Sequence, residues 1–238
     1  MTVPRQTLVQ AAYESVRAAI LDGTLAPGSR VTVRPLAEQL GLSPTPLQGA
    51  LAALEREGFL ITIPHRGYFV PEVGVNDLLE LYELREAVDG IAGRRAAAAS
   101  GHASIADDLD MLLAEQRTAV EAGDLVSYGD LDLLFHRRIW EGSNNARLLP
   151  IAENLIAQVR LGNRLSAQAP GRLPAALTEH EAIANAIRNG DAGAAERLVR
   201  RHVKHASKAL RRYLELHRGD SNDGSLSHAL QATGRAET

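Results

Sequence analysis

The hydrophobic positions of the first 70 residues recur at helical spacing and then give way to short apolar runs. They predict helices over 8–21, 35–40 and 44–57, the last with Ser43 as N-cap and Pro44 in its first turn. Two apolar runs, 59–63 and 67–70, lie on either side of a Pro-containing turn and predict a β-hairpin. This order of elements predicts a winged helix-turn-helix.

The rest of the chain has helical periodicity without strand alternation. Gly and Pro breaks divide it into predicted helices over 77–100, 104–122, 124–140, 146–164, 173–189 and 192–216. We therefore predict a mainly α protein, in which the winged helix-turn-helix is followed by an all-α antiparallel helical bundle. The predicted boundaries are 1–71 for the first domain, 72–76 for a linker with Asn76 as the next N-cap, 77–216 for the bundle and 217–238 for a disordered tail.

Composition narrows the functional classes. The chain has 45% hydrophobic and 23% charged residues, which is typical of a globular protein, and its 4% aromatic content favours helices packed through aliphatic side chains. The absence of Cys excludes disulfides, thiolate metal ligands and cysteine nucleophiles. There is no long apolar run and no secretory signal at the N-terminus, so we expect a cytoplasmic protein with no membrane partner.

Three of the eight histidines lie on apolar helix faces, and one shares its face with a carboxylate. Asp132 and His136 are four residues apart, while His180 and His202 lie on two later helices. Periodicity places His205 among cations instead, facing water. One carboxylate and three imidazoles suit a divalent transition metal such as Zn, Ni or Mn. The alternative is a set of core polar residues, each satisfied by its own partner.

A resemblance to the GntR family of bacterial transcription regulators covers about residues 10–71. It rests on the turn and recognition-helix positions Leu36-Ala37-Glu38-Gln39-Leu40-Gly41-Leu42-Ser43, Thr45-Pro46-Leu47, Ala50-Leu51, Leu54 and Glu57-Gly58, with Gly67 and Val70 in the wing. The resemblance implies that the recognition helix enters the major groove of double-stranded operator DNA and that the wing tip meets the minor groove. By the same resemblance, the DNA contacts fall at Arg34, Ser43, Thr45, His65, Arg66 and Gly67.

The predicted recognition helix departs from that family pattern. Pro44 stands where the family usually has Arg, and Gln48 and Gly49 stand where it has Arg-Glu. Gln48 is still able to read adenine through two hydrogen bonds. Residues 1–74 contain six Arg, no Lys and six carboxylates, so this domain is neutral, although phosphate neutralisation normally supplies much of the affinity for DNA. Either its cations gather on one face, or binding is weak per subunit and depends on a dimer.

The second domain resembles the FadR C-terminal (FCD) ligand-binding domain over roughly 77–216. The motif is Asp132-x-x-Phe135-His136, then His180-x-x-Ile183-x-x-Ala186-Ile187-x-x-Gly190-Asp191, then His202. The resemblance implies a metal held by the Asp and the three His, and a small carboxylate effector held beside it. Arg85 matches an inward Arg near the ligand, and Arg160 and Arg164 are further candidates, with a solvent-facing position as the alternative for each.

These features together favour a homodimeric transcription regulator, not an enzyme, whose operator affinity responds to a small organic acid. Two alternatives remain. The first is a metal-dependent enzyme acting on a small organic acid, because three His and one Asp leave coordination positions open to water. The second is a regulator in which the metal is purely structural.

Overall fold

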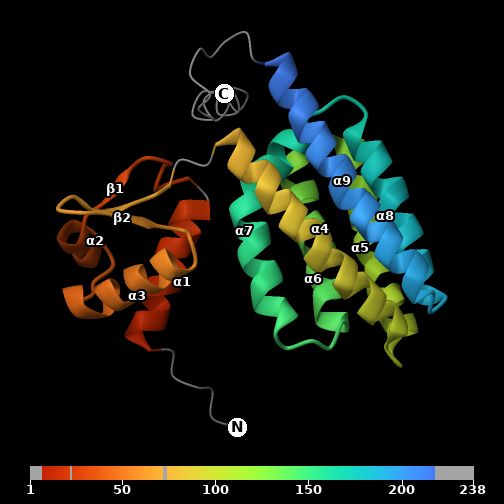
Figure 1. Cartoon of the computed structure of the whole chain (residues 1–238), viewed down its shortest axis with the longest axis horizontal. Coiled ribbons are helices and arrows are strands. Elements are labelled where there is room, and N and C mark those ends of the chain that lie inside the picture. Colours follow the sequence, from red (N-terminus) through yellow and green to blue (C-terminus); the bar gives the residue numbers. More distant parts are fainter. Residues whose placement is uncertain (1–6, 22, 72–73, 218–238) are drawn as a thin grey trace. The chain divides into compact units, whose positions relative to one another are not determined.

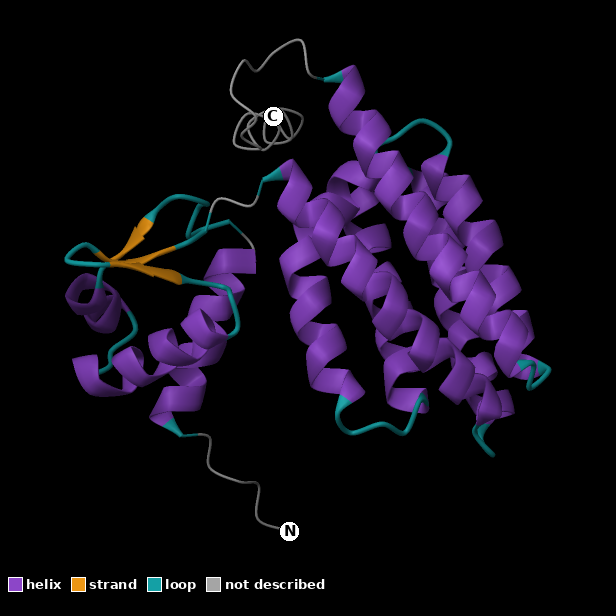
Figure 2. Cartoon of the chain, viewed as in Figure 1, coloured by secondary structure: helices purple, strands orange, loops and turns teal. Residues whose placement is uncertain are grey.

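A computed structural model describes residues 7–21, 23–71 and 74–217. The chain divides into two compact units between Gly74 and Val75, within the expected linker, and each unit is described by itself (Figures 1 and 2). Most of the tail expected to be disordered, 218–238, lies outside the described residues. Its first residue, His217, instead caps the last helix, and its Nδ1 lies 2.7 Å from the carbonyl oxygen of Tyr213.

The first unit is a winged helix-turn-helix, as predicted. It comprises α1 (Leu8–Leu21), β1 (Arg30–Val31), α2 (Val33–Gln39), α3 (Pro44–Arg56), β2 (Ile61–Ile63) and β3 (Gly67–Phe69). The strands form an antiparallel sheet in the order β1-β3-β2, in which Arg30 pairs with Phe69 and Ile61 pairs with the same residue from the other side. Strand β1 was not predicted, because two residues are too few to show the alternation that marks a strand.

The turn between α2 and α3 positions the predicted recognition helix. Gly41 follows α2 with a φ of 64°, a left-handed conformation that glycine adopts without strain. Ser43 is extended and Pro44 opens α3 as predicted, although the Ser43 side chain makes no capping hydrogen bond. Helix α3 buries Leu47, Ala50, Leu51 and Leu54, which turns its opposite face outward.

The wing turns at residues 63–66. The amide of Arg66 donates to the carbonyl of Ile63 at 2.9 Å, and His65 has a φ of 62°. Proline at the second position and a positive φ at the third are the marks of a type II turn, in which the third position favours glycine. The wing therefore holds His65 in a conformation that costs a non-glycine residue of the order of 1 kcal/mol.

The second unit consists of helices and loops in its described part, which confirms the predicted helical domain (Figure 2). Its helices are α4 (Val75–Ala98), α5 (His102–Ala122), α6 (Leu125–Gly142), α7 (Leu148–Ala167), α8 (Arg172–Arg188) and α9 (Ala192–Leu216). Helix α4 begins before Asn76, so that residue is not the N-cap. Helix α7 begins two residues and ends three residues later than predicted, because residues 146–147 belong to the turn before it.

Helix α4 is the centre of the second unit and contacts each of the other five helices. It packs most extensively against α9, where two glycines leave no room for a side chain. A Cβ on Gly90 would lie 2.6 Å from Cγ of Arg200, and one on Gly93 would lie 2.8 Å from Cγ2 of Val199. The two helices therefore pack nearly backbone to backbone. None of the described helices is long and apolar enough to cross a bilayer.

Candidate functional site

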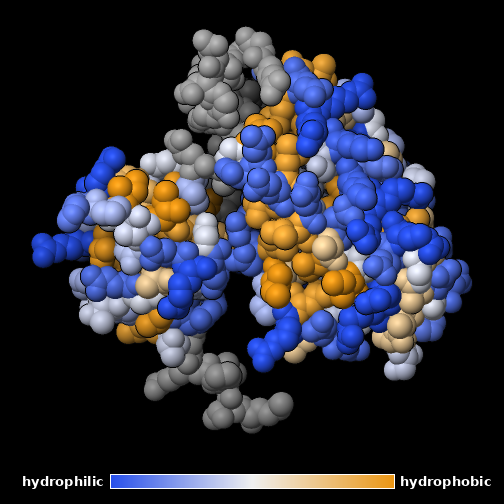
Figure 3. All heavy atoms as spheres, viewed as in Figure 1, coloured by the Kyte–Doolittle hydropathy of each residue, from blue (hydrophilic) through white to orange (hydrophobic). Residues whose placement is uncertain are grey.

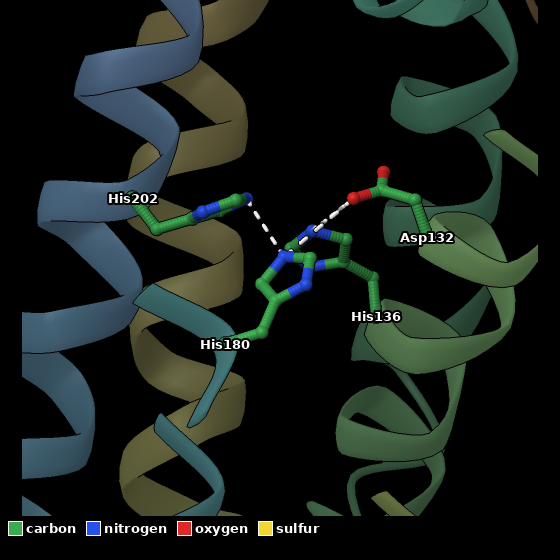
Figure 4. A group of neighbouring side chains, drawn as sticks. All are labelled: Asp132, His136, His180 and His202. Carbon is green, nitrogen blue, oxygen red and sulfur yellow. Dashed lines mark hydrogen bonds and ion pairs between the residues drawn. The ribbon is translucent and has the colours of Figure 1, made fainter. Parts of the chain in front are cut away.

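Three helices of the second unit bring the predicted metal ligands together. Asp132 and His136 extend from α6, His180 from α8 and His202 from α9, and their side chains converge (Figure 4). One ligand atom from each residue lies within 4.8 Å of the others. The three imidazoles are at most 3% exposed, whereas the Asp132 side chain is 16% exposed. The grouping expected from helical periodicity is therefore present, with its carboxylate on the more open side.

The separations within this cluster suit a shared ion. Nε2 of His180 lies 3.4 Å from Nε2 of His202 and 3.5 Å from Oδ1 of Asp132, and Nε2 of His136 lies 4.0 Å from the same oxygen. Ligand atoms at about 2.0–2.2 Å from a divalent ion stand roughly 3–3.5 Å apart around it. Nε2 of His136 is buried without a hydrogen-bond partner. An ion at the centre would satisfy that atom.

Outside the cluster, each imidazole faces an oxygen with its other ring nitrogen. Nδ1 of His180 lies 2.9 Å from Oε1 of Gln116, and Nδ1 of His202 lies 2.8 Å from Oε2 of Glu179. Nδ1 of His136 lies 3.7 Å from Oδ2 of Asp89. Partners of this kind orient metal-binding imidazoles and leave Nε2 as the free electron-pair donor. The arrangement favours binding of a metal through three Nε2 atoms.

Burial also gives the imidazoles the protonation state that a metal requires. Removal from water lowers the pKa of His136 and His180 well below the usual range, and the neighbouring Arg85 and Arg172 lower it further. Burial lowers the pKa of His202 as well, although its hydrogen bond to Glu179 opposes that shift. Neutral imidazoles are the form that binds metal ions.

Glu179 joins the cluster to two further side chains, those of Arg172 and His205. Burial alone would raise its pKa, but hydrogen bonds with His202 and His205 and the charge of Arg172 lower it to about 2. Nη1 of Arg172 lies 2.8 Å from Oε2 of Glu179, and Nδ1 of His205 lies 2.6 Å from Oε1. His205 is 43% exposed, in accordance with its predicted outward position. Glu179 is therefore an ionised carboxylate that compensates Arg172.

A small cavity of about 30 Å³ adjoins the cluster. Its polar lining comes from Arg85, Asp132, Asn163, Ser166, Arg172, His202 and Tyr128. Arg85 is buried, its Nε donates to Asp89 at 3.0 Å and its Nη1 donates to Asn163 at 3.1 Å, but its Nη2 has no partner. The predicted effector residue Arg85 thus lines the cavity. Arg160 and Arg164 do not, because both are exposed on α7 and Arg160 faces Asp130 at 3.6 Å.

The residues expected to contact DNA all lie at the surface of the first unit. Arg34 is in the first turn of α2, Thr45 and Gln48 are on the outer face of α3, and Ser43 precedes that helix. His65, Arg66 and Gly67 form the exposed tip of the wing. At Gly49, a Cβ would make ordinary contact with Val9 at 3.5 Å, so packing does not require glycine there.

Sequence reasoning missed four polar residues that surround the cluster. They are Asp89 on α4, Gln116 on α5, and Arg172 and Glu179 on α8. Asp89 is four residues after Arg85, and Glu179 precedes a predicted ligand directly, so spacing offered a signal for both. Arg172 follows a Pro-Gly break, and the periodicity predicts a helix only from residue 173, whereas Arg172 is the first residue of α8.

A winged helix-turn-helix followed by a separate all-helical unit is the domain organisation of a DNA-binding regulator. Comparison with known families gives one match for each of the two units. Residues 8–70 match the family described as bacterial regulatory proteins, gntR family, and residues 80–205 match the FCD domain. The chain belongs to the GntR family of transcriptional regulators and contains an FCD domain.

Individual relatives are transcription regulators. The chain is 34% identical to the HTH-type transcriptional regulator McbR of Escherichia coli (strain K12) over 66% of this chain and 70% of that protein. It is 36% identical to the Nta operon transcriptional regulator of Aminobacter aminovorans, over 56% of this chain and 63% of that regulator. The solved structure of E. coli McbR/YncC superposes with a TM-score of 0.71 at 25% identity, covering 87% of this chain and 98% of that one.

Proposed function

We propose that this regulator is a homodimer that binds operator DNA in the cytoplasm and that a small carboxylate, bound beside a divalent transition metal in the helical unit, controls its operator affinity. The observation that carries the proposal is a pair of buried atoms without partners at one site. These are Nε2 of His136, which points into the ligand cluster, and Nη2 of Arg85, whose side chain lines the adjoining cavity.

The first of these atoms supports a metal. A buried ring nitrogen without a partner is costly, and neither Asp132 nor His180 comes within hydrogen-bond distance of Nε2 of His136. An ion held by Asp132, His136, His180 and His202 would give that nitrogen a partner and leave coordination positions for oxygen ligands. When bound, such an ion would supply a positive charge that attracts a carboxylate.

The second atom supports an anion. Arg85 is ion-paired to Asp89 at 3.0 Å, and Arg172 to Glu179 at 2.8 Å, so these four charges cancel. A divalent ion beside the single charge of Asp132 would leave one positive charge in a buried site. One carboxylate would neutralise it, and the free Nη2 of Arg85 would donate to one of its oxygens. The site therefore favours a small monocarboxylate.

Two successive experiments test this proposal, the first measuring metal content and the second measuring the effect of carboxylates on the melting temperature. Elemental analysis of the purified protein should detect Zn, Ni or Mn, and His180→Ala should remove it. Small mono- and dicarboxylates should then raise the melting temperature of the metal-loaded wild-type protein but not that of a metal-loaded Arg85→Gln variant. A matched Arg164→Gln variant, altered at the exposed surface, should respond as the wild type does.

The remaining step is regulation of DNA. An effector found in this way should change the affinity of the protein for its operator, measured by fluorescence anisotropy with and without metal. A metal that raises stability while no carboxylate affects melting or DNA affinity would instead make the ion purely structural. Turnover of the bound acid by the metal-loaded protein would show an enzyme and contradict the sensor function.

A further inference from the structure

Helix α9 has a concentration of positive charge that the metal site does not use. Its 25 residues include seven Arg or Lys and two carboxylates, in a chain whose net charge is −3. Six of the cations share one side of the helix, which we term the α9 cationic face: Arg197, Arg201, Lys204, Lys208, Arg211 and Arg212. At about 100° per residue, these positions fall within a stripe of roughly 100°.

Most of this charge is not neutralised within the protein. Oε1 of Glu86 forms an ion pair with Nη2 of Arg200 at 2.8 Å and another with Nζ of Lys204 at 3.3 Å. Among the described residues, no carboxylate forms an ion pair with any of the other five cations of the α9 cationic face, and all five are exposed. Such a row of like charges favours an anionic partner.

The shape and composition of the α9 cationic face suit a phosphate backbone. It extends over 15 residue steps, about 22 Å, which is the axial rise of roughly six base pairs. A shallow hollow runs along it, lined by Arg197, Arg200, Arg201, Lys204, His205 and Lys208. The surface over α9 is mainly hydrophilic (Figure 3), and the one exposed large apolar side chain of the described helix, Leu216, lies at its end. Protein interfaces depend on buried aromatic and apolar anchors, which this face lacks.

The winged helix-turn-helix has no net positive charge of its own, which suggests what the α9 cationic face contributes. Residues 1–74 have six Arg against six carboxylates, so the winged helix-turn-helix is neutral overall. Contacts with phosphate nevertheless supply most of the sequence-independent affinity for DNA. The chain thus has its recognition surface in one unit and its largest excess of cations on a helix of the other.

We propose that the α9 cationic face binds the phosphate backbone of duplex DNA, so that the helical unit contributes sequence-independent affinity. This inference rests on the proposed DNA binding of the full chain. The contact is electrostatic and reads no bases. Its contribution is therefore largest at low salt and is lost as counterions compete.

The test measures how binding depends on salt. The full-length protein is titrated into a fluorescent double-stranded oligonucleotide of arbitrary sequence at several salt concentrations. The variant is Arg201→Gln, Lys208→Gln and Arg212→Gln combined. Neutralising three phosphate contacts should reduce the slope of log K against log salt by about 2.7 per protomer bound. The matched control removes three exposed cations elsewhere on the helical unit, Arg117→Gln, Arg137→Gln and Arg147→Gln, and should leave the slope unchanged.

Three other outcomes would contradict the role of α9, the DNA binding of the chain, or the identity of the partner. An unchanged slope in the α9 variant, together with weaker binding by Arg66→Gln, would overturn the role of α9 and leave DNA binding by the wing intact. Absence of binding by the wild-type protein to both this duplex and its own promoter fragments would overturn the proposed function itself. A changed oligomeric state in light scattering, with an unchanged slope, would make the α9 cationic face a contact between protein chains. Unchanged melting temperatures would confirm that both triple variants fold.

Discussion

The two units of this regulator place their functional side chains in opposite environments. In the winged helix-turn-helix the core is apolar, and every residue expected to contact DNA is exposed. In the helical unit the predicted ligands are buried among other polar groups, with Arg85, Asp89 and Gln116 nearly inaccessible to water. Exposed recognition residues cost the fold little, whereas buried polar residues need partners. We therefore expect a bound metal ion to stabilise the second unit and to leave the stability of the first unchanged.

Metal binding should produce the largest difference in stability between the two units. At a metal concentration 1,000 times the Kd, we expect the helical unit to gain about 4 kcal/mol. Chelation should reverse the gain, and His180→Ala should abolish it because it removes one of four ligands. Differential scanning calorimetry of the metal-loaded and chelated protein measures both. A gain that persists in His180→Ala would show that the ion binds elsewhere.

Removing an apolar side chain from the core of the winged helix should destabilise the first unit and leave the helical unit unaffected. Leu51 is fully buried in α3, so Leu51→Ala should destabilise the first unit by about 2–5 kcal/mol. DNA binding should be lost with it, while metal content, measured by elemental analysis, stays at the wild-type level. Arg56→Ala at the end of the same helix is the control, since that side chain is exposed and is not among the expected DNA contacts. Loss of metal from Leu51→Ala would show that the units do not fold independently.

The outer partners of the imidazoles should have an intermediate effect. Gln116 is fully buried, and it accepts from His180 and donates to the carbonyl of Leu131 at 3.1 Å. Gln116→Leu should weaken metal binding about 10–100-fold, because the His180 ring loses the acceptor that orients it. Gln116→Glu keeps an acceptor and should retain more of the affinity. Calorimetric titration with Zn²⁺ compares them, and equal affinities would exclude an orienting role for Gln116.

The smallest effect on stability should come from the recognition surface. Gln48→Ala should change the free energy of unfolding by less than about 0.5 kcal/mol. If Gln48 reads a base, the same substitution should cost about 1–3 kcal/mol of discrimination at one operator position. Binding to a set of operators with single base changes would measure this. An unaltered pattern of preferences would mean that Gln48 reads no base.

Local pattern predicted the elements and the ligand cluster because both depend on helical periodicity. His202 and His205 are three residues apart, and the apolar neighbours of the first were enough to place it in the core. The same reasoning failed for Arg172 and Gln116, whose burial depends on Glu179 and His180. Helix α4 also gave a weak signal for its buried face, because that face includes Arg85, Asp89 and two glycines, whereas large apolar residues of the helix are exposed. Residues that depend on distant partners are not apparent from periodicity.

The central position of α4 has a consequence for signalling. Arg85, which faces the cavity, and Val75, the first residue of α4, are ten residues apart on one uninterrupted helix. That is a rod of about 15 Å. The glycines at its crossing with α9 fix the rod closely against its neighbour. If an effector displaces the cavity end of α4, we expect the main-chain hydrogen bonds of this helix to carry the displacement to its first turn, next to the linker.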